Sequence, residues 1–138
     1  MGNGYNVKDA LLKQTKALPA AIGSVTSTPI NLETNPTGDF VAPVQLKLTA
    51  PALDDDQLPD THTAIYDILM DTSASMGSPT VLYNDVITQT GATSAGDVGN
   101  SFIFSLPANV ESFIAAKCTT TSTAADASAV SLTLEVLL

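Results

Sequence analysis

The chain has 138 residues, enough for one domain with one hydrophobic core, and its 44% hydrophobic against 14% charged residues predict that it folds. The formal charge of −9 argues against a nucleic-acid partner, because phosphate binding depends on clustered Lys and Arg. Small residues dominate, aromatic residues are few and Trp is missing from the composition. This mix favours β-structure with many polar turns over a helical enzyme.

The charge is unevenly distributed along the chain. Residues 1–17 contain three lysines and one aspartate, whereas the remainder contains two lysines and thirteen carboxylates. This split predicts that the leader and the body face different surroundings. The opening "MGNGYNVKDALLKQTK" has the pattern of neither a signal peptide nor a myristoylation site, and no transmembrane run follows. We expect a soluble product made in a cytoplasm, without a membrane partner.

The first residues predict a short amphipathic helix. Asn6 suits a helix N-cap, with Asp9 three residues later. Apolar residues then recur at helical spacing: Val7, Ala10, Leu11 and Leu18. Lys13 and Lys16 suit the carboxyl end, and Pro19 ends the segment. A helix of about three turns is marginal alone in water, so it needs a surface, either a partner or its own domain.

After Pro19 the apolar residues alternate with a period of two, which indicates β-strands. The expected strands are Ser24–Leu32, Val44–Thr49, Ala64–Met70, Val81–Thr88, Ser101–Leu106, Ser112–Thr119 and Val130–Leu138. Pro29 marks the first of them as an edge strand or a bulge. Segments rich in Gly, Pro, Asp and Ser separate the strands, which is typical of a sandwich or jelly roll. We expect an arm over 1–20 and a β-sandwich over 21–138.

A polar motif follows the most apolar of these strands. Asp71, Ser73 and Ser75 resemble the metal-ion-dependent adhesion site of von Willebrand A domains, in which an Asp and two Ser hydroxyls hold a cation. That site needs a helix directly after the serines and ligands from later loops. Here Gly77–Pro79 leads into another expected strand, and too little chain remains for alternating strands and helices. The sequence therefore favours a surface turn, with a metal-dependent adhesion module as a third alternative.

The other polar segments do not predict a catalytic, cofactor or metal site. The acidic run Asp54–Asp60 lacks the Gly and Glu of an EF-hand loop, so we interpret it as a solvated loop. His62 lies in a polar loop, and no Gly-x-Ser-x-Gly elbow provides a nucleophile. Cys118 is the single cysteine and reads as a small buried thiol. We expect no catalytic, cofactor or metal site, and not an enzyme.

Three stretches, taken in order, carry a resemblance to a known family. Residues 16–33, "KALPAAIGSVTSTPINLE", form a Leu-Pro, small-residue lead-in to a first strand. Residues 67–82, "DILMDTSASMGSPTVL", read as a strand, an Asp-Ser-Ala type turn and a further strand. Residues 102–138 contain a Leu-Pro before "FIAA", an Ala-Asp-rich turn and a closing alternating strand. In this order they resemble the small capsid decoration, or cement, proteins of tailed phages.

This resemblance covers roughly residues 16–138 and implies both a fold and a role. The family implies an all-β, jelly-roll-like sandwich of about seven or eight strands, carrying here an N-terminal arm with a short helix. It also implies a place on the outer surface of a virion capsid, assembled in the host cytoplasm, with the major capsid protein as partner. Such proteins are commonly homotrimers whose extended N-terminal arm grips the shell. Residues 1–15 are not matched.

The residues of the arm are the expected binding site. We expect the apolar ones to bury against the capsid or a neighbouring subunit, and the lysines to meet acidic partners. They are Val7, Leu11, Leu12, Leu18, Lys8, Lys13 and Lys16. The alternative in another class is a receptor- or carbohydrate-binding β-module, such as a fibre head. Core positions expected for Tyr66, Phe102, Phe104 and Phe113 weaken that alternative, because exposed aromatic side chains usually carry sugar binding.

Overall fold

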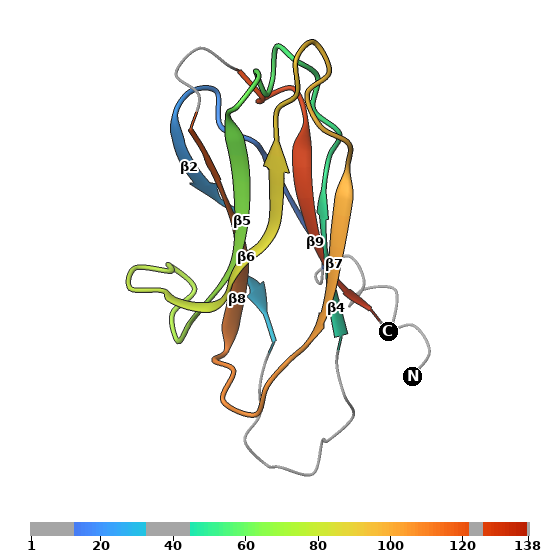
Figure 1. Ribbon diagram of the computed structural model, residues 1–138. Helices are drawn as coiled ribbons and strands as arrows, with labels where there is room; N and C mark the ends of the chain where they lie inside the picture. The colour runs from blue at the N-terminus through green and yellow to red at the C-terminus, as the bar shows by residue number, and fades with distance from the viewer. Residues whose placement is uncertain (1–12, 33–44, 122–125, 138) are drawn as a thin grey trace.

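The computed structural model describes residues 13–32, 45–121 and 126–137, which form strands packed into two antiparallel sheets (Figure 1). No helix occurs among these residues. The predicted all-β sandwich is therefore confirmed. The strands are β1 Lys13–Ala17, β2 Gly23–Thr26, β3 Ile30–Asn31, β4 Gln45–Ala50, β5 Thr63–Asp71, β6 Thr80–Thr90, β7 Asn100–Ser105, β8 Phe113–Thr120 and β9 Ser131–Leu137.

The two sheets share one pattern of strand pairing. The first sheet has the order β1-β9-β4-β7, and the second has the order β2-β8-β5-β6 with β3 also paired to β8. The antiparallel pairs β1 with β9, β2 and β3 with β8, β4 with β7, and β5 with β6 are nested inside one another along the chain. The chain therefore folds as one long antiparallel ribbon that is bent over to make both layers.

Six of the seven expected strands match β4 to β9, with ends that differ by a residue or two. The expected strand Ser24–Leu32 is divided into β2 and β3, which both pair with β8 at the edge of the second sheet. Pro29 lies in the break, where its missing N–H breaks no ladder bond. The prediction that Pro29 marks an edge strand is confirmed, whereas the division into two strands was not predicted.

The prediction of a helix is wrong for its carboxyl half, because residues Lys13–Ala17 form strand β1. They pair in register with β9, from Lys13 opposite Glu135 to Ala17 opposite Ser131. A short isolated helix gains little in water, whereas β1 satisfies the backbone groups along one edge of β9. The amino half of the expected helix lies outside the described residues. Strand β1, within the expected arm 1–20, pairs with β9 of the first sheet.

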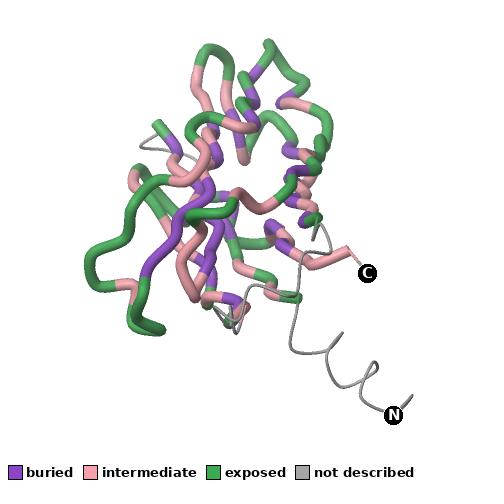
Figure 2. The backbone as a smooth tube through the Cα atoms, turned by 90° about the horizontal axis from the view of Figure 1, so that it is seen from below, coloured by how far each residue is buried: buried purple, intermediate pink, exposed green. Residues whose placement is uncertain are grey.

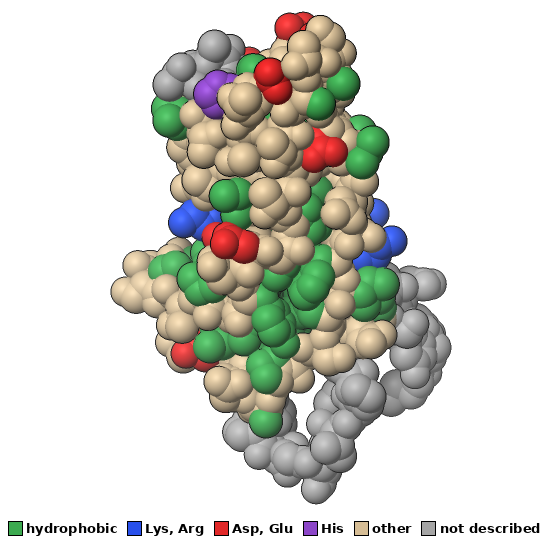
Figure 3. Space-filling view, viewed as in Figure 1, with side chains coloured by type: hydrophobic (Ala, Val, Ile, Leu, Met, Phe, Trp, Pro, Cys, Tyr) green, Lys and Arg blue, Asp and Glu red, His purple; other side chains and the backbone are tan. Residues whose placement is uncertain are grey.

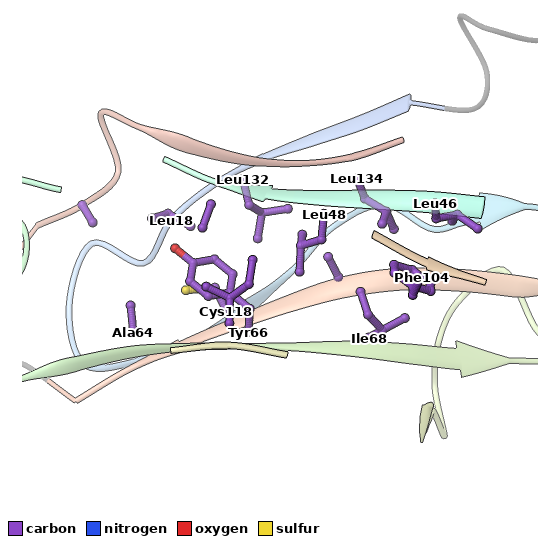
Figure 4. Packing of buried hydrophobic residues seen from close by; sticks show 14 of the residues in the cluster. Leu18, Leu46, Leu48, Ala64, Tyr66, Ile68, Phe104, Cys118, Leu132 and Leu134 are labelled. Atoms are coloured by element: carbon purple, nitrogen blue, oxygen red, sulfur yellow. The ribbon is translucent and has the colours of Figure 1, made fainter. Parts of the chain in front are cut away.

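Leu18 lies in the core of its own chain. Its side chain is buried between the two sheets, close to Leu132 and Tyr66 (Figure 4). The expectation that Leu18 binds the capsid or a neighbouring subunit is therefore wrong. The segment after β1 crosses from one sheet to the other, and a Leu at this point closes the sandwich at that end.

The core follows from the alternation of the strands. Leu46 and Leu48 of β4 and Leu132 and Leu134 of β9 point inward from the first sheet, and Tyr66 and Ile68 of β5 meet them from the second (Figure 4). Each fully buried Leu or Ile contributes about 1.5–3 kcal/mol relative to exposure. Buried residues consequently follow the inner sides of both sheets, and exposed ones follow the loops (Figure 2).

One hydrogen-bonded polar cluster lies inside this apolar core. The Tyr66 hydroxyl donates to Gln89 Oε1 at 2.7 Å, and Gln89 Nε2 donates to the backbone carbonyls of Pro51 and Val98 at 2.8 and 2.9 Å. Both side chains are buried. The amide of Gln89 therefore ties strand β6 to the segments that follow β4 and precede β7.

Burial raises the pKa of neighbouring Cys118 to about 12, so its thiol stays protonated, as expected for a structural cysteine.

Replacing Gln89 tests this cluster. Gln89→Leu leaves two carbonyls without their donor and the Tyr66 hydroxyl without its acceptor, in a site closed to water. We expect the free energy of unfolding, measured by urea denaturation, to fall by about 2–4 kcal/mol. Gln45→Leu, at an exposed position of β4, is the matched control and should change it by less than about 0.5 kcal/mol. Equal effects of the two substitutions would contradict this account.

Candidate interaction surface

The Asp71 carboxylate organises the 72–79 loop between β5 and β6. Its Oδ1 accepts a hydrogen bond from the Ser73 N–H, and its Oδ2 accepts one from the Ser78 N–H, both at 3.1 Å. Desolvation raises the pKa of Asp71, but the backbone N–H groups of Ser73, Ser78 and Thr72 outweigh it and lower the pKa below its usual value. The predicted turn between two strands is confirmed.

The structure brings together the three residues of the adhesion-site motif. The Ser73 and Ser75 hydroxyls are 2.9 Å apart, and Asp71 holds the Ser73 backbone. Both Asp71 carboxylate oxygens are already engaged by backbone donors, however, and strand β6 follows where the adhesion site requires a helix. All the strand pairs described are antiparallel, so the surrounding fold is not that of an adhesion module. The motif is a loop anchor.

Asp71→Asn should destabilise the protein in a pH-dependent manner. Because the folded pKa is lowered, the ionised carboxylate stabilises the fold above the unfolded value near 3.8, and this contribution disappears as the pH falls through the folded value. We expect the variant to melt a few degrees below wild type at pH 7 and to match it more closely near pH 3. Asp55→Asn, in an exposed loop, is the control. A deficit for Asp71→Asn that does not change with pH would contradict this prediction.

One end of the sandwich is acidic. The loops 51–62 and 91–99, together with residues 126–130, gather there and contain Asp54, Asp55, Asp56, Asp60, Asp97 and Asp126. The carboxylates of Asp54, Asp55 and Asp56 lie within 4.8 Å of one another and are exposed. Asp54 Oδ1 accepts hydrogen bonds from the backbone of Asp56 and Gln57, so it caps its own turn. This geometry fits the solvated loop predicted from the sequence.

Two glycines let the loops of the acidic end approach closely. Gly96 has a φ of +60°, and a Cβ atom there would lie 2.0 Å from the Leu53 carbonyl oxygen. A Cβ atom at Gly91 would lie 2.0 Å from the Pro59 carbonyl oxygen. The backbone of Leu53 also pairs with that of Asp97. The acidic end is therefore built from loops packed against each other rather than from independent tips.

The predicted arm residues are not on one surface. Lys13 is opposite Glu135, and Glu135 neighbours Lys47 across β9 and β4, so these charges form one row on the outer face of the first sheet. Lys16 is opposite Leu132, whose side chain enters the core, so Lys16 lies on the inner side at the sheet edge. The strand thus separates the two lysines that a helix would bring together. Four further predicted residues lie outside the described part: Val7, Lys8, Leu11 and Leu12.

An apolar surface lies along the open side of the sandwich between β6 and β7 (Figure 3). We call it the β6–β7 strip, and it consists of Leu82, Tyr83 and Phe102, flanked by Val81 of β6 and by Ile103, which lies on the outer face of the first sheet opposite Lys47. Val81 is 49% exposed and Ile103 is 54% exposed, while the other three are half-buried. The rings of Tyr83 and Phe102 meet edge-to-face at 6.2 Å, and the Tyr83 hydroxyl donates to the Ser105 carbonyl at 2.9 Å. The strip therefore bridges the two sheets at the surface.

Both strands that border the strip have an unpaired edge in the described structure. Strand β6 pairs with β5, strand β7 pairs with β4, and each ends its sheet. Edge strands present free N–H and C=O groups that another chain can pair with. An apolar strip between two such edges is a surface suited to bind an extended or apolar segment of a protein.

Sequence reasoning missed this strip because it placed Phe102 in the core. Tyr66 and Phe104 are buried as expected, but Phe102 and Phe113 are only half-buried. The signal was a loss of alternation, since Val81, Leu82 and Tyr83 are consecutive and Ile103 lies between two Phe residues. A strand that is apolar on both faces next to a free edge exposes one of them.

Comparisons with known protein families, with curated proteins and with solved structures found no match to this chain. In the part of the chain that the structure describes, no helix is long and apolar enough to cross a membrane.

Proposed function

We propose that this chain is a structural virion protein, a capsid decoration protein that binds the exterior of a tailed-phage head and stabilises the shell. The observation that carries the proposal is the two-ended surface. The acidic loops 51–62 and 91–99 gather at one end, whereas the apolar β6–β7 strip, with a few acidic side chains beside it, occupies the other half of the same side (Figure 3). A cement protein needs this division, because one part of it contacts protein and the other faces solvent.

The strand order supports the jelly-roll form of the fold. If β2 and β3 are counted as one strand interrupted at Pro29, eight strands form four nested antiparallel pairs. A jelly roll is a long antiparallel ribbon wrapped into two sheets, with eight strands. The same fold is implied by the resemblance of residues 16–138 to the cement proteins.

The mechanism is stabilisation by mass action. A protein that binds only the assembled shell favours that shell, and weak contacts repeated over a symmetric lattice add up. The β6–β7 strip contacts the shell, while the acidic end stays in solvent. The major capsid protein is the proposed partner, and a homotrimer is the proposed form on the virion surface.

The alternative is a receptor- or carbohydrate-binding module of a virion. The half-buried pair Tyr83 and Phe102 favours it, because aromatic faces at a surface can bind sugar rings. The Tyr83 hydroxyl, however, is bonded to the Ser105 carbonyl and the rings meet each other edge-to-face. These contacts favour a structural role for the pair.

Cosedimentation tests the proposal directly. The full chain is mixed with heads assembled from the major capsid protein encoded with it, and the heads are pelleted. We expect saturable binding, and decorated heads that withstand heating or chelator better than bare heads. The test variant is Ile103→Glu. The matched control is Ile22→Glu, because Ile22 is 57% exposed and lies near the acidic end. We expect Ile103→Glu to weaken binding at least tenfold and Ile22→Glu to bind as wild type. A chain that never pellets with heads would exclude the function.

A further inference from the structure

We propose that strand β7 pairs with β7 of a second copy of this chain, antiparallel and about a two-fold axis at Ile103. The paired copies would share one continuous sheet. The inference goes beyond the proposed function, because it concerns the chain free in solution and rests on the backbone of a strand edge. The pair also differs from the homotrimer proposed for the virion surface.

Among the described edge strands β1, β7, β2 and β6, only β7 lacks a feature that opposes pairing. Strand β1 carries Lys13 and Lys16, and lysines on an edge discourage the approach of another strand. Strand β2 has four residues and begins at Gly23, whose φ is +136°. Strand β6 has register shifts on both sides of Ile68 and a positive φ at Asp85, and such bulges twist an edge away. Strand β7 has six uncharged residues in unbroken register with β4.

The direction of the backbone groups of β7 follows from the ladder across the first sheet. In an antiparallel sheet, alternate residues of a strand bond to opposite neighbours. The Leu18 N–H donates to the Val130 carbonyl at 3.0 Å, in the register that β1 and β9 share. Even-numbered residues of β9 therefore bond to β1, and odd-numbered ones bond to β4. Through the registers of β9 with β4 and of β4 with β7, Phe102 and Phe104 bond to β4.

Ser101, Ile103 and Ser105 consequently turn their backbone groups toward the free edge. Two side-chain hydrogen bonds agree with this direction. Asn100 Oδ1 accepts a hydrogen bond from the Ser101 N–H at 2.8 Å, and the Tyr83 hydroxyl donates to the Ser105 carbonyl at 2.9 Å. Within the described residues, the groups left free are both backbone groups of Ile103, the C=O of Ser101 and the N–H of Ser105.

The sequence of β7 reads the same in both directions about Ile103, since residues 101–105 are Ser-Phe-Ile-Phe-Ser. An antiparallel pair centred there places Ile103 opposite Ile103 of the second copy, and Ser101 opposite Ser105. Ile103 then exchanges both backbone hydrogen bonds with its counterpart, and the Ser105 N–H donates to the Ser101 carbonyl of the second copy. The Ser101 N–H and the Ser105 carbonyl, which are already bonded within each copy, face each other. This register satisfies the backbone groups that each copy leaves free.

The side chains at this seam are compatible with the pairing. Ile103 is 54% exposed on the outer face of the first sheet, and Ile103 of the second copy would lie beside it and cover it. Phe102, which is half-buried, lies opposite Phe104 of the second copy. No charged side chain lies opposite another across the seam, because the nearest ones on this row, Lys47 of each copy, are separated by both isoleucines.

The charge distribution also fits an antiparallel pair. Strand β7 begins directly after the loop 91–99 of the acidic end. Antiparallel pairing therefore puts the acidic ends of the two copies at opposite ends of the joined sheet, which lowers the repulsion between two chains of charge −9. A second copy on β7 covers the edge that borders the β6–β7 strip. The pair would then have to separate before a shell binds there, a consequence that rests on the proposed function.

Sedimentation velocity of the full chain over a range of concentrations tests the pairing. Ile103→Glu and Ile103→Lys each place like charges opposite one another at the two-fold axis, whereas an equal mixture places Glu opposite Lys. We expect each variant alone to dimerise at least tenfold more weakly than wild type, and the mixture to form one-to-one dimers. Ile22→Glu and Ile22→Lys, at a position that is 57% exposed and precedes β2, are the matched controls and should dimerise as wild type. Thermal unfolding confirms that each variant is folded.

A second pair of variants tests the backbone contact. Ser105→Pro removes an N–H that faces the free edge, so it breaks no bond to β4, and Ser105→Ala keeps that N–H. We expect dimerisation to weaken at least tenfold in Ser105→Pro and to stay at the wild-type level in Ser105→Ala. Equal dimerisation of these two variants would overturn the inference.

The remaining outcomes separate this inference from other occupants of the β7 edge and from the proposed function. A mixture of the Ile103 variants that stays monomeric would overturn the inference. A monomeric wild type whose Ile103 and Ser105 amides exchange slowly would also overturn it, and would show that residues 1–12 or 33–44 of the same chain cover β7. A monomeric wild type that cosediments with heads would remove the pairing and leave the proposed function standing. A wild type that dimerises in this register but never pellets with heads would support the pairing and exclude that function.

Discussion

The packing of two alternating apolar faces is the constraint on which the rest of this structure depends. Each strand gives every second side chain to the interior, so Leu46 and Leu134 from one sheet meet Tyr66 and Ile68 from the other. A one-residue slip in any strand would turn its apolar set outward. The buried side-chain amide of Gln89 links this core to the loops, because it hydrogen-bonds to the Tyr66 hydroxyl and to two loop carbonyls.

The same constraint explains the open side of the sandwich. A ribbon bent into two layers leaves each sheet with edges, and β6 and β7 are the edges on one side. Apolar residues on the inner faces of edge strands are only partly covered, which is the position of Tyr83 and Phe102. Where the outward residues are apolar as well, as at Val81 and Ile103, the edge exposes apolar surface, which we propose as the binding surface. The proposed functions all draw on this surface.

The fold was largely predictable from the sequence, and the candidate surface was not. Alternation located β4 to β9, and Pro29 located the break between β2 and β3, because both signals are local. The segment Lys13–Ala17 was predicted as helix because its lysines also fit a helix end. Its strand conformation depends on β9, more than a hundred residues later in the chain. Leu18 was assigned to a partner surface for the same reason, since only the crossing between sheets places it in the core. The half-exposure of Phe102 likewise depends on which strand ends a sheet, and no local pattern encodes that order.

The central claim is that the acidic end faces solvent and the β6–β7 side is covered in the assembled state. Hydrogen exchange, measured on the free chain at low concentration and on the chain bound to heads, tests it most directly. The account predicts slower exchange on assembly for residues 80–83 and 101–105 and unchanged exchange for the loop 51–62, as long as the heads remain intact. Protection of 51–62 with no change at the β6–β7 strip would contradict it.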